Sequence, residues 1–333
     1  MANILLLGAG FSKNWGAPVT SEFFHALIAD PEVRANQHIR TLLWEHRSNF
    51  EEALAGLQEA YARDRQVNRE PLLLLQRAIS RVFEKINKIF KRQDFETYQP
   101  VLTLDRLRSV RWFLARFDAI FTLNQDLLLE IHYFDQNHGG QGERHWNGGS
   151  LPGLQPIGQP TNSATPWSSR FWTPTGDLNV PPNSQPFYKL HGSTNWKSAH
   201  GNDELMIMGT GKLKAIRENH LLDQYHHKFA DFMRLGNTRL TVIGYGFGDE
   251  HINRTLQMAV SEHAMQMYVI DPRGAGIAWE ARIARHGKIH EKTSEFEEWF
   301  QKGLYGASIT PFRRLMIDET LDREVLEDFL TGK

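Results

Sequence analysis

The stretch NILLLGAGFS, residues 3–12, decides the fold class. Its first five residues form a short, fully apolar run that stops at Gly8 and Gly10, which predicts a buried parallel strand rather than a helix. Thr20 and Ser21 follow the turn and are suited to cap a helix that ends near Asp30. The chain therefore opens as strand, glycine turn and helix.

Four later runs repeat this arrangement, because each is short and apolar and each stops at polar or glycine residues. They are residues 119–123, 187–190, 240–243 and 267–270. Ligands of an open parallel sheet bind just beyond the carboxyl ends of its strands, so the residues after these runs are candidate site residues. The sequence predicts an α/β fold, a Rossmann-like parallel sheet with helices on both faces.

The remaining segments are predicted to belong to the same single domain, residues 1–333. Residues 34–116 are interpreted as a helical insertion, in which Pro71 is expected to begin a long amphipathic helix. Residues 136–186, rich in Gly, Pro, Ser, Asn and Trp, are interpreted as a long loop: a lid, a surface excursion, or a segment with short strands. Residues 276–333 are predicted to be a mainly helical extension, with two amphipathic helices within 293–333.

Composition excludes several classes of function. The 333 residues contain no cysteine, which excludes disulfides, thiol nucleophiles, iron–sulfur clusters and any Cys-based zinc module. With a net charge of −1, the protein has no overall positive charge to attract nucleic acid, so we infer no direct nucleic-acid binding. No apolar run reaches the length of a membrane span, so we expect a cytoplasmic protein with no membrane contact.

The turn at residues 8–12 is suited to phosphate binding, because glycine lets the backbone approach a pyrophosphate and the following amides point toward it. Gly16 lies six residues after Gly10 rather than three, so the spacing is not the standard dehydrogenase fingerprint. A tight strand-to-helix turn also needs glycine without any ligand. The motif alone therefore leaves phosphate binding and a purely structural turn open.

Three later strand ends carry polar groups. Asn124 and Asp126 follow the second run, where they suit either a ligand contact or an Asx turn. His191 follows the third; a lone histidine is more often structural, but the glycine after it gives a ligand access. The segment GYGFGDEH, residues 244–251, is a second glycine-rich turn. It lacks the i, i+4 histidine pair of zinc proteases, so we predict no metal.

Taken in order, these motifs resemble the sirtuin (SIR2) superfamily. The residues that carry the resemblance are GAGFS at 8–12, TLNQD at 122–126, HG at 191–192 and the glycine turn at 244–248. More closely, the sequence resembles bacterial SIR2-like NAD-hydrolysing effectors of anti-phage defence, in which segments such as GYGFGDEHIN are typical. The resemblance covers roughly residues 1–30, 117–135, 185–215 and 238–275.

The resemblance implies a role for each matching residue. Catalysis would fall to Asn124, which positions the ribose or a water, to His191 as the base, and to Asp126 near the carboxamide. Phe11 would lie beside the nicotinamide ribose, and Asp271 would contact the adenosine end. The implied NAD+-binding residues are Gly8, Ala9, Gly10, Phe11, Ser12, Thr122, Gly244, Tyr245, Gly246 and Asp271.

Two departures from the sirtuin deacetylases bear on the reaction. The Asp-Phe-Arg that follows Gly-x-Pro in those enzymes is absent, since residues 16–20 read GAPVT, and the zinc module has no cysteines to build it. These departures favour an NAD+ glycohydrolase that uses NAD+ as substrate, needs no metal, and releases nicotinamide and ADP-ribose. The alternatives are an NAD-dependent protein deacylase and a non-catalytic subunit that senses NAD or another nucleotide.

The chemistry of hydrolysis suits the implied residues. Nicotinamide leaves NAD+ as a neutral molecule and needs no general acid, while the transition state resembles an oxocarbenium ion. Asn124 would orient a water and His191 would accept a proton near neutral pH. Because unchecked NAD+ hydrolysis would be toxic, we expect the activity to be gated, and the resemblance implies an effector of anti-phage defence. Homo-oligomerisation, a separately encoded activator or a HerA-type ATPase would control it.

Overall fold

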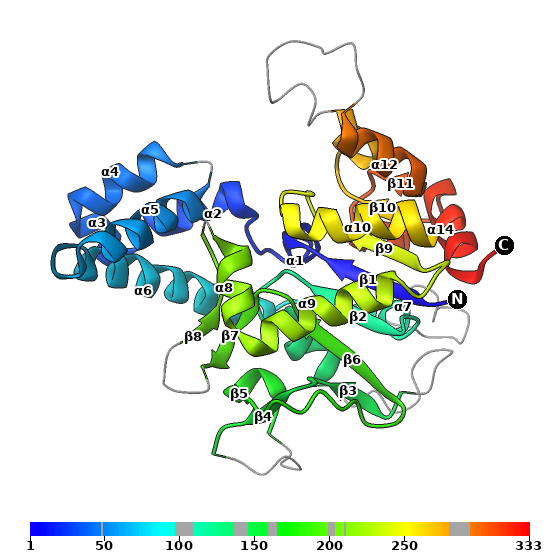
Figure 1. The fold of residues 1–333 in the computed structure, drawn as a ribbon, viewed down its shortest axis with the longest axis horizontal. Helices are drawn as coiled ribbons and strands as arrows, with labels where there is room; N and C mark the ends of the chain where they lie inside the picture. Colours follow the sequence, from blue (N-terminus) through cyan, green and yellow to red (C-terminus); the bar gives the residue numbers. More distant parts are fainter. Residues whose placement is uncertain are drawn as a thin grey trace.

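The computed structural model describes residues 1–47, 49–96, 109–135, 146–158, 165–198, 204–209, 211–279 and 294–333. A central sheet of seven strands runs in the order β11-β10-β9-β1-β2-β6-β3, and every neighbouring pair is parallel (Figure 1). The predicted parallel α/β fold is confirmed. The strands are β1 (Asn3–Leu7), β2 (Ala119–Thr122), β3 (Gly148–Ser150), β6 (Ser184–Lys189), β9 (Arg239–Ile243), β10 (Gln266–Ile270) and β11 (Leu304–Ser308).

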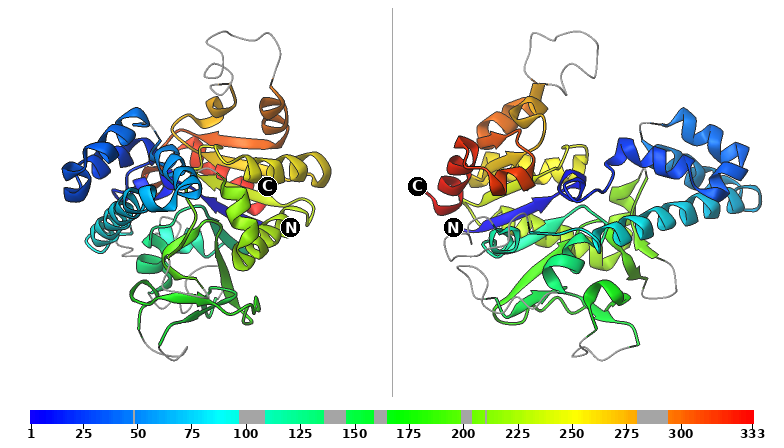
Figure 2. Two further views of the ribbon diagram at one scale, coloured as in Figure 1. Left: turned by 60° about the vertical axis from the view of Figure 1, so that its left-hand side comes forward. Right: turned by 180° about the vertical axis from the view of Figure 1, so that it is seen from behind.

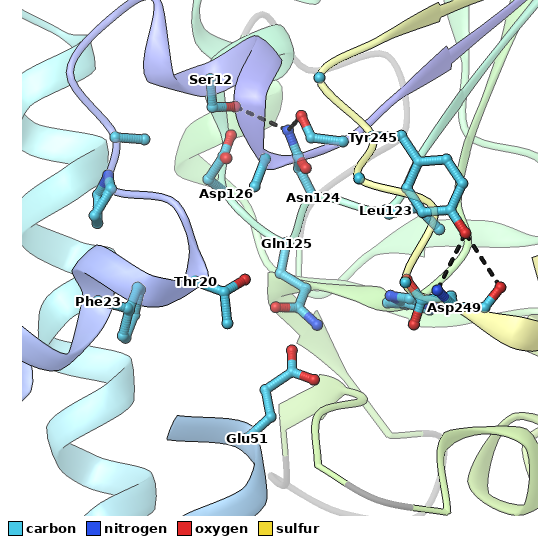
Figure 3. A pocket seen from close by; sticks show the side chains of 18 of the residues that line it. Ser12, Thr20, Phe23, Glu51, Leu123, Asn124, Gln125, Asp126, Tyr245 and Asp249 are labelled. Carbon is cyan, nitrogen blue, oxygen red and sulfur yellow. Dashed lines mark hydrogen bonds between the residues drawn. The ribbon is translucent and has the colours of Figure 1, made fainter. Parts of the chain in front are cut away.

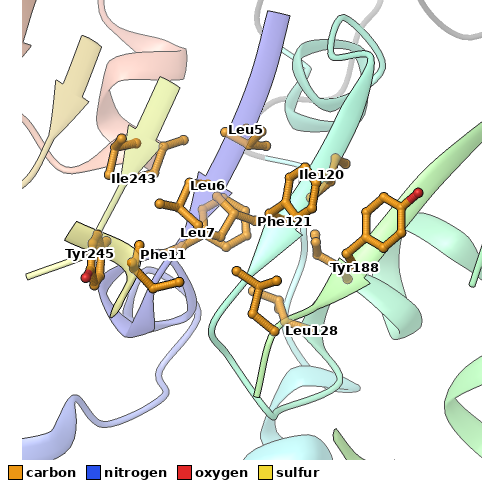
Figure 4. Packing of buried hydrophobic residues seen from close by; sticks show 14 of the residues in the cluster. Leu5, Leu6, Leu7, Phe11, Ile120, Phe121, Leu128, Tyr188, Ile243 and Tyr245 are labelled. Atoms are coloured by element: carbon orange, nitrogen blue, oxygen red, sulfur yellow. The ribbon is translucent and has the colours of Figure 1, made fainter. Parts of the chain in front are cut away.

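Strand β1 forms the centre of the hydrophobic core. Leu5, Leu6 and Leu7 are fully buried because β2 and β9 pair with its two edges and helices cover both faces of the sheet. A strand buried on both faces has no solvent-facing positions, which explains why its sequence is apolar throughout rather than alternating. Figure 4 shows these side chains packed against those of the neighbouring strands.

The helices on the two faces of the sheet are fixed by aromatic contacts. On one face lie α9 (His220–Met233) and α10 (Glu250–His263), where the Phe229 ring centroid is 5.0 Å from that of Phe121 on β2. Elsewhere α1 (Ala9–Lys13), α7 (Val110–Leu114) and α13 (Phe312–Ile317) meet around the ring of Phe312. That ring lies 5.4 Å from Phe11 and 5.1 Å from Phe113, between centroids.

A helical lobe stands beside the sheet, and Figures 1 and 2 show it projecting from the carboxyl-end side of β1. It comprises α2 (Thr20–Ile28), α3 (Pro31–Ala35), α4 (Gln37–Glu45), α5 (Phe50–Arg63) and α6 (Arg65–Phe90). The prediction that Pro71 begins the long helix is wrong, since α6 starts six residues earlier. Its start is fixed by Asp64, whose carboxylate accepts hydrogen bonds from the backbone N–H groups of Gln66 and Val67.

A second sheet of four short strands, in the order β4-β5-β7-β8, lies after β3 in the chain. Its strands are β4 (Leu154–Pro156), β5 (Trp172–Pro174), β7 (Gly192–Lys197) and β8 (Glu204–Met206). The segment 136–186 thus contains β3, β4, β5 and the start of β6 within its described part. Residues 136–145 and 159–164 of that segment lie outside the described residues.

The C-terminal segment is mainly helical but is not helical throughout. It contains α12 (Glu295–Gly303), α13 and α14 (Leu321–Thr331), and β11 lies between the first two as the edge strand of the central sheet. The prediction of two helices within 293–333 missed this strand; residues 280–293 lie outside the described residues. Among the helices that the structure describes, none has the length and apolar character needed to span a membrane.

Candidate active site

A cavity of about 360 Å³ opens at the carboxyl ends of β1, β2, β6 and β9. β1 is the strand from which the chain continues to β2 on one side and later to β9 on the other. This is the switch point at which open parallel sheets bind ligands, and the volume is in the range of small-molecule sites. The helical lobe supplies the opposite wall, and Figure 3 shows Glu51 of α5 facing the residues that follow β2.

Two glycine turns form the floor of this cavity, and they pack backbone against backbone. The Gly8 N–H donates to the Ile243 carbonyl at 3.0 Å, and the Gly10 N–H donates to the Gly244 carbonyl at 2.9 Å. Gly244 has φ +64°, and a Cβ there would lie 2.3 Å from the backbone nitrogen of Phe11. The close approach of the two strand ends therefore requires glycine at this position.

Asn124 is held in one orientation by the first of these turns. Its Nδ2 donates to the Gly8 carbonyl at 2.9 Å and to the Ser12 hydroxyl at 3.0 Å (Figure 3). The Ser12 hydroxyl in turn hydrogen-bonds to the Asp126 carboxylate. Both protons of the Asn124 amide are thus used within the protein, and within the described residues no hydrogen bond reaches its Oδ1. That oxygen is left to accept a bond from a ligand in the cavity.

A buried ion pair supports the loop that carries Asn124 and Asp126. Lys189 Nζ lies 2.7 Å from Glu130 Oε1, each side chain is 1% exposed, and the same Nζ donates to the Asp126 carbonyl at 2.5 Å. Burial raises the pKa of both the Asp126 and the Glu130 carboxyl groups, and the Lys189 charge opposes that rise. Glu130 begins a π-helical turn, Glu130–Phe134, a rare conformation that recurs near functional sites.

His191 lies on the wall of the cavity and is almost completely buried. Burial lowers its pKa to about 3, and the negative charge of Asp249 only partly compensates. The imidazole is therefore neutral at physiological pH. Its Nε2 lies 3.4 Å from Nε2 of His251 in α10, and His226 of α9 completes a cluster of three histidines. Only His191 of the three lines the cavity.

An ion-pair triad joins the helical lobe to the sheet domain across the cavity mouth. Lys212, at the start of α8 (Lys212–Glu218), lies 2.6 Å from Glu51 of α5 and 3.2 Å from Asp249, the residue before α10. Burial opposes the charge on Lys212, but the two carboxylates raise its pKa. Neither Glu51 nor Lys212 was predicted from the sequence, because no motif surrounds either residue. Asp249 lies within the segment GYGFGDEH, residues 244–251, but its contact with Lys212 was not predicted.

The structure brings most of the predicted site residues together at this cavity. Those that line it are Gly8, Ala9, Ser12, Asn124, Asp126, His191, Gly244, Tyr245 and Gly246. Gly10, Phe11, Thr122 and Asp271 do not line it. Phe11 is 1% exposed and packs in the core (Figure 4), and the Thr122 hydroxyl accepts from the Asn124 N–H at 3.0 Å. Asp271 instead pairs with Arg273 at 3.0 Å.

Comparison with known families identifies the family of the chain. A family model described as a SIR2-like domain matches residues 118–297, more than half of the chain, so the protein belongs to the SIR2-like domain family. The matched segment includes Asn124, Asp126, His191 and the turn at Gly244 but not the turn at Gly8. SIR2-like domains use NAD+ as a substrate. No curated protein matches the sequence.

Proposed function

We propose that the protein is an NAD+ glycohydrolase that cleaves the bond between nicotinamide and ribose to give nicotinamide and ADP-ribose. The observation that carries this proposal is the fixed Asn124 side chain, whose Nδ2 is committed to Gly8 and Ser12 and whose Oδ1 remains an acceptor. A rigid acceptor at a strand end suits the ribose hydroxyls or the attacking water, because its orientation needs no reorganisation during the reaction.

The neutral state of His191 suits a dissociative mechanism. The carbon–nitrogen bond breaks first, its electron pair leaves with nicotinamide, and the ribosyl oxocarbenium ion then accepts the oxygen of water. A water bonded to that cation is strongly acidic, so a weakly basic imidazole is sufficient to accept its proton. Burial of His191, which lowers its pKa to about 3, keeps the acceptor free of protons before the reaction.

The test follows nicotinamide and ADP-ribose chromatographically after the purified full chain is mixed with NAD+, with and without an acetyl-lysine peptide. We expect equal release in both samples. Asn124→Ala and His191→Ala should each lower kcat by about 10²–10⁴-fold. The matched controls are Asn179→Ala, in an exposed loop, and His227→Ala, which is exposed on α9.

Three outcomes separate the competing functions. Nicotinamide release only in the presence of peptide, together with an O-acylated ADP-ribose product, would identify a deacylase. NAD+ binding without any turnover would identify a sensing subunit. Wild-type rates in both cavity variants would overturn the assignment of Asn124 and His191.

We further propose that this activity is gated and serves as an NAD-depleting effector in anti-phage defence. Free NAD+ hydrolysis would be toxic to the cell that makes the enzyme, which supports a gate, and the resemblance of the segment GYGFGDEHIN to those of SIR2-like defence effectors supports the role in defence. A homo-oligomer, a separately encoded activator or a HerA-type ATPase would provide the gate. Mass measurements of the protein alone and with the products of neighbouring genes, paired with the nicotinamide assay, test this: an ungated monomer with full activity contradicts it.

A further inference from the structure

Three histidines from different elements converge behind the wall of the cavity. His191 follows β6, His226 lies in the middle of α9, and His251 lies in the first turn of α10. One ring nitrogen of each lies within 4.8 Å of a ring nitrogen of the other two. No carboxylate or cysteine is needed to complete this set, since three imidazoles with an open fourth position already form a known zinc ligand set.

We propose that His191, His226 and His251 bind a divalent transition-metal ion, with Zn²⁺ as the representative, and that the bound ion inhibits the enzyme. The site itself is independent of the enzymatic activity, whereas the inhibition rests on the proposed NAD+ glycohydrolase function.

The spacing of the first two ligands fits zinc. Nε2 of His191 lies 3.4 Å from Nε2 of His251. Two nitrogens at about 2.0–2.1 Å from a tetrahedral zinc ion lie about 3.3–3.4 Å apart, so these atoms already have the separation of two adjacent ligands. Two facing imidazole nitrogens share at most one proton in the neutral state, which leaves a lone pair directed into the gap.

The third histidine has one ring nitrogen bonded to the backbone, which leaves the other nitrogen as the one that would bind an ion. Nε2 of His226 lies 3.0 Å from the Leu190 carbonyl, so it carries the proton and donates it, and Nδ1 keeps the lone pair. A metal-ligating imidazole typically donates its other ring N–H to a backbone carbonyl or carboxylate, which fixes both the tautomer and the ring orientation.

The charges around the cluster are mixed: Asp223 acts favourably on His226 and Glu250 on His251, and a third carboxylate reaches every ring. Asp249 acts on all three rings with its negative charge, which favours a bound cation, and Lys212 opposes it at His191 and His251. The Lys212 charge is itself offset by its two partners, Glu51 at 2.6 Å and Asp249 at 3.2 Å. The local balance therefore remains suited to a dication.

The consequence for catalysis follows from the shared ligand. His191 is the one histidine of the cluster that also lines the cavity. A metal that takes its Nε2 lone pair removes the proton acceptor from the cavity wall and adds positive charge beside the position of the ribosyl cation. Both effects slow the reaction, so the bound metal would inhibit the enzyme through His191, the one member of the cluster that also takes part in the proposed substrate chemistry.

The test uses Co²⁺ as a spectroscopic probe and Zn²⁺ as the competitor on the EDTA-treated full chain. We expect a visible d–d absorption band with Co²⁺ that Zn²⁺ displaces, and a rise in thermal stability with Zn²⁺. His226→Gln should lower the affinity for Co²⁺ and for Zn²⁺ by roughly tenfold or more, because glutamine is a poor zinc ligand. Glutamine can still donate to the Leu190 carbonyl, so the fold should be retained. His227→Gln, an exposed neighbour on the same helix, is the matched control and should bind as the wild type does.

The activity assay then addresses inhibition separately. Zn²⁺ should reduce nicotinamide release by the wild type and by His227→Gln, EDTA should restore it, and His226→Gln should release nicotinamide normally and resist Zn²⁺. If His226→Gln fails to fold, His251→Gln replaces it in the Co²⁺ measurement. Absence of the Co²⁺ band, or a band unchanged in the folded variant, would overturn the site. A normal band in a chain that does not cleave NAD+ would sustain the site and refute only the glycohydrolase.

Discussion

Replacing Lys189 by Met should destabilise the protein strongly, because it leaves the Glu130 carboxylate in the core without a counter-charge. The two groups lie 2.7 Å apart, and each side chain is only 1% exposed. Oε2 of Glu130 has no hydrogen-bond partner within the described residues, so Lys189 is the main group that stabilises its charge.

The expected loss is about 3–5 kcal/mol of unfolding free energy, the usual cost of removing one partner of a buried pair. Solvent does not screen the pair, so we expect the upper part of that range, a large share of the roughly 5–15 kcal/mol that stabilises a typical domain. The double variant Lys189→Met, Glu130→Leu should recover most of the loss, because well-packed apolar side chains replace buried pairs with little penalty.

The loss of unfolding free energy in Lys189→Met should also depend on pH, and the titration of Glu130 determines whether the loss grows or shrinks as pH rises. Burial raises the pKa of Glu130 above its usual value, and the Lys189 charge opposes that rise. Without Lys189 the folded-state pKa rises further, so the group's contribution is intact near pH 4.5 and is lost as pH rises through the folded-state pKa. The deficit of Lys189→Met relative to wild type should therefore be smaller at pH 5 than at pH 8.

Urea unfolding of the single and double variants at both pH values tests these expectations, with Lys85→Met on the exposed face of α6 as a control. The double variant should stay impaired in nicotinamide release, because it lacks the Nζ donor that fixes the Asp126 carbonyl. A loss below about 1 kcal/mol for Lys189→Met, or a loss equal at pH 5 and pH 8, would refute the reasoning.

Two further predictions concern the glycine floor and the histidine cluster. Gly244→Ala should cost about 2–5 kcal/mol, from the positive φ and the overlap with the Phe11 backbone, whereas Gly248→Ala, which has open space, should cost less than about 0.5 kcal/mol in the same urea assay. Burial lowers the pKa of His191 to about 3 and of His226 to about 4, so the unfolded chain binds protons that the folded chain excludes. The unfolding free energy of the metal-free protein should fall by up to about 1.4 kcal/mol per pH unit for each of these histidines as pH falls below about 6.5. Because the raised pKa values of Asp126 and Glu130 act in the opposite sense, the wild type is compared with His226→Gln, and an equal pH dependence of the two proteins from pH 7 to pH 5 would contradict the prediction.

The parallel sheet was predictable from the sequence because its central strands are buried on both faces. Such strands are continuous apolar runs, and five of the seven were identified on that basis. β11 was not, since it is an edge strand with the sequence LYGAS, in which Tyr305 is exposed and Gly306 packs against Tyr268. β3, with sequence GGS, carries no apolar signal at all.

The site was predictable only where its residues follow strands. Asn124, Asp126 and His191 could be placed at one edge because parallel strands end together. Glu51 lies on α5 of the helical lobe and Lys212 on α8, and the positions of these helices over the cavity depend on tertiary packing, which no local pattern encodes. The three-histidine cluster was missed for the same reason: its members are 35, 25 and 60 residues apart and share no ligand spacing.

The glycines of the two turns are required by the close packing of the turns themselves, so their motif is weaker evidence for phosphate binding. Gly8, Gly10 and Gly244 resemble phosphate-binding glycines, yet each is already required by the other turn, since a Cβ at any of them would overlap the facing backbone. The Gly10 N–H could otherwise donate a hydrogen bond to a pyrophosphate, but it donates to the Gly244 carbonyl instead. Glycines at adjacent strand ends therefore indicate first that the strand ends lie close together, and only second that a ligand binds there. Asn124 supports NAD+ binding more strongly, because its amide protons are donated to the Gly8 carbonyl and the Ser12 hydroxyl of the first turn while its oxygen remains an acceptor.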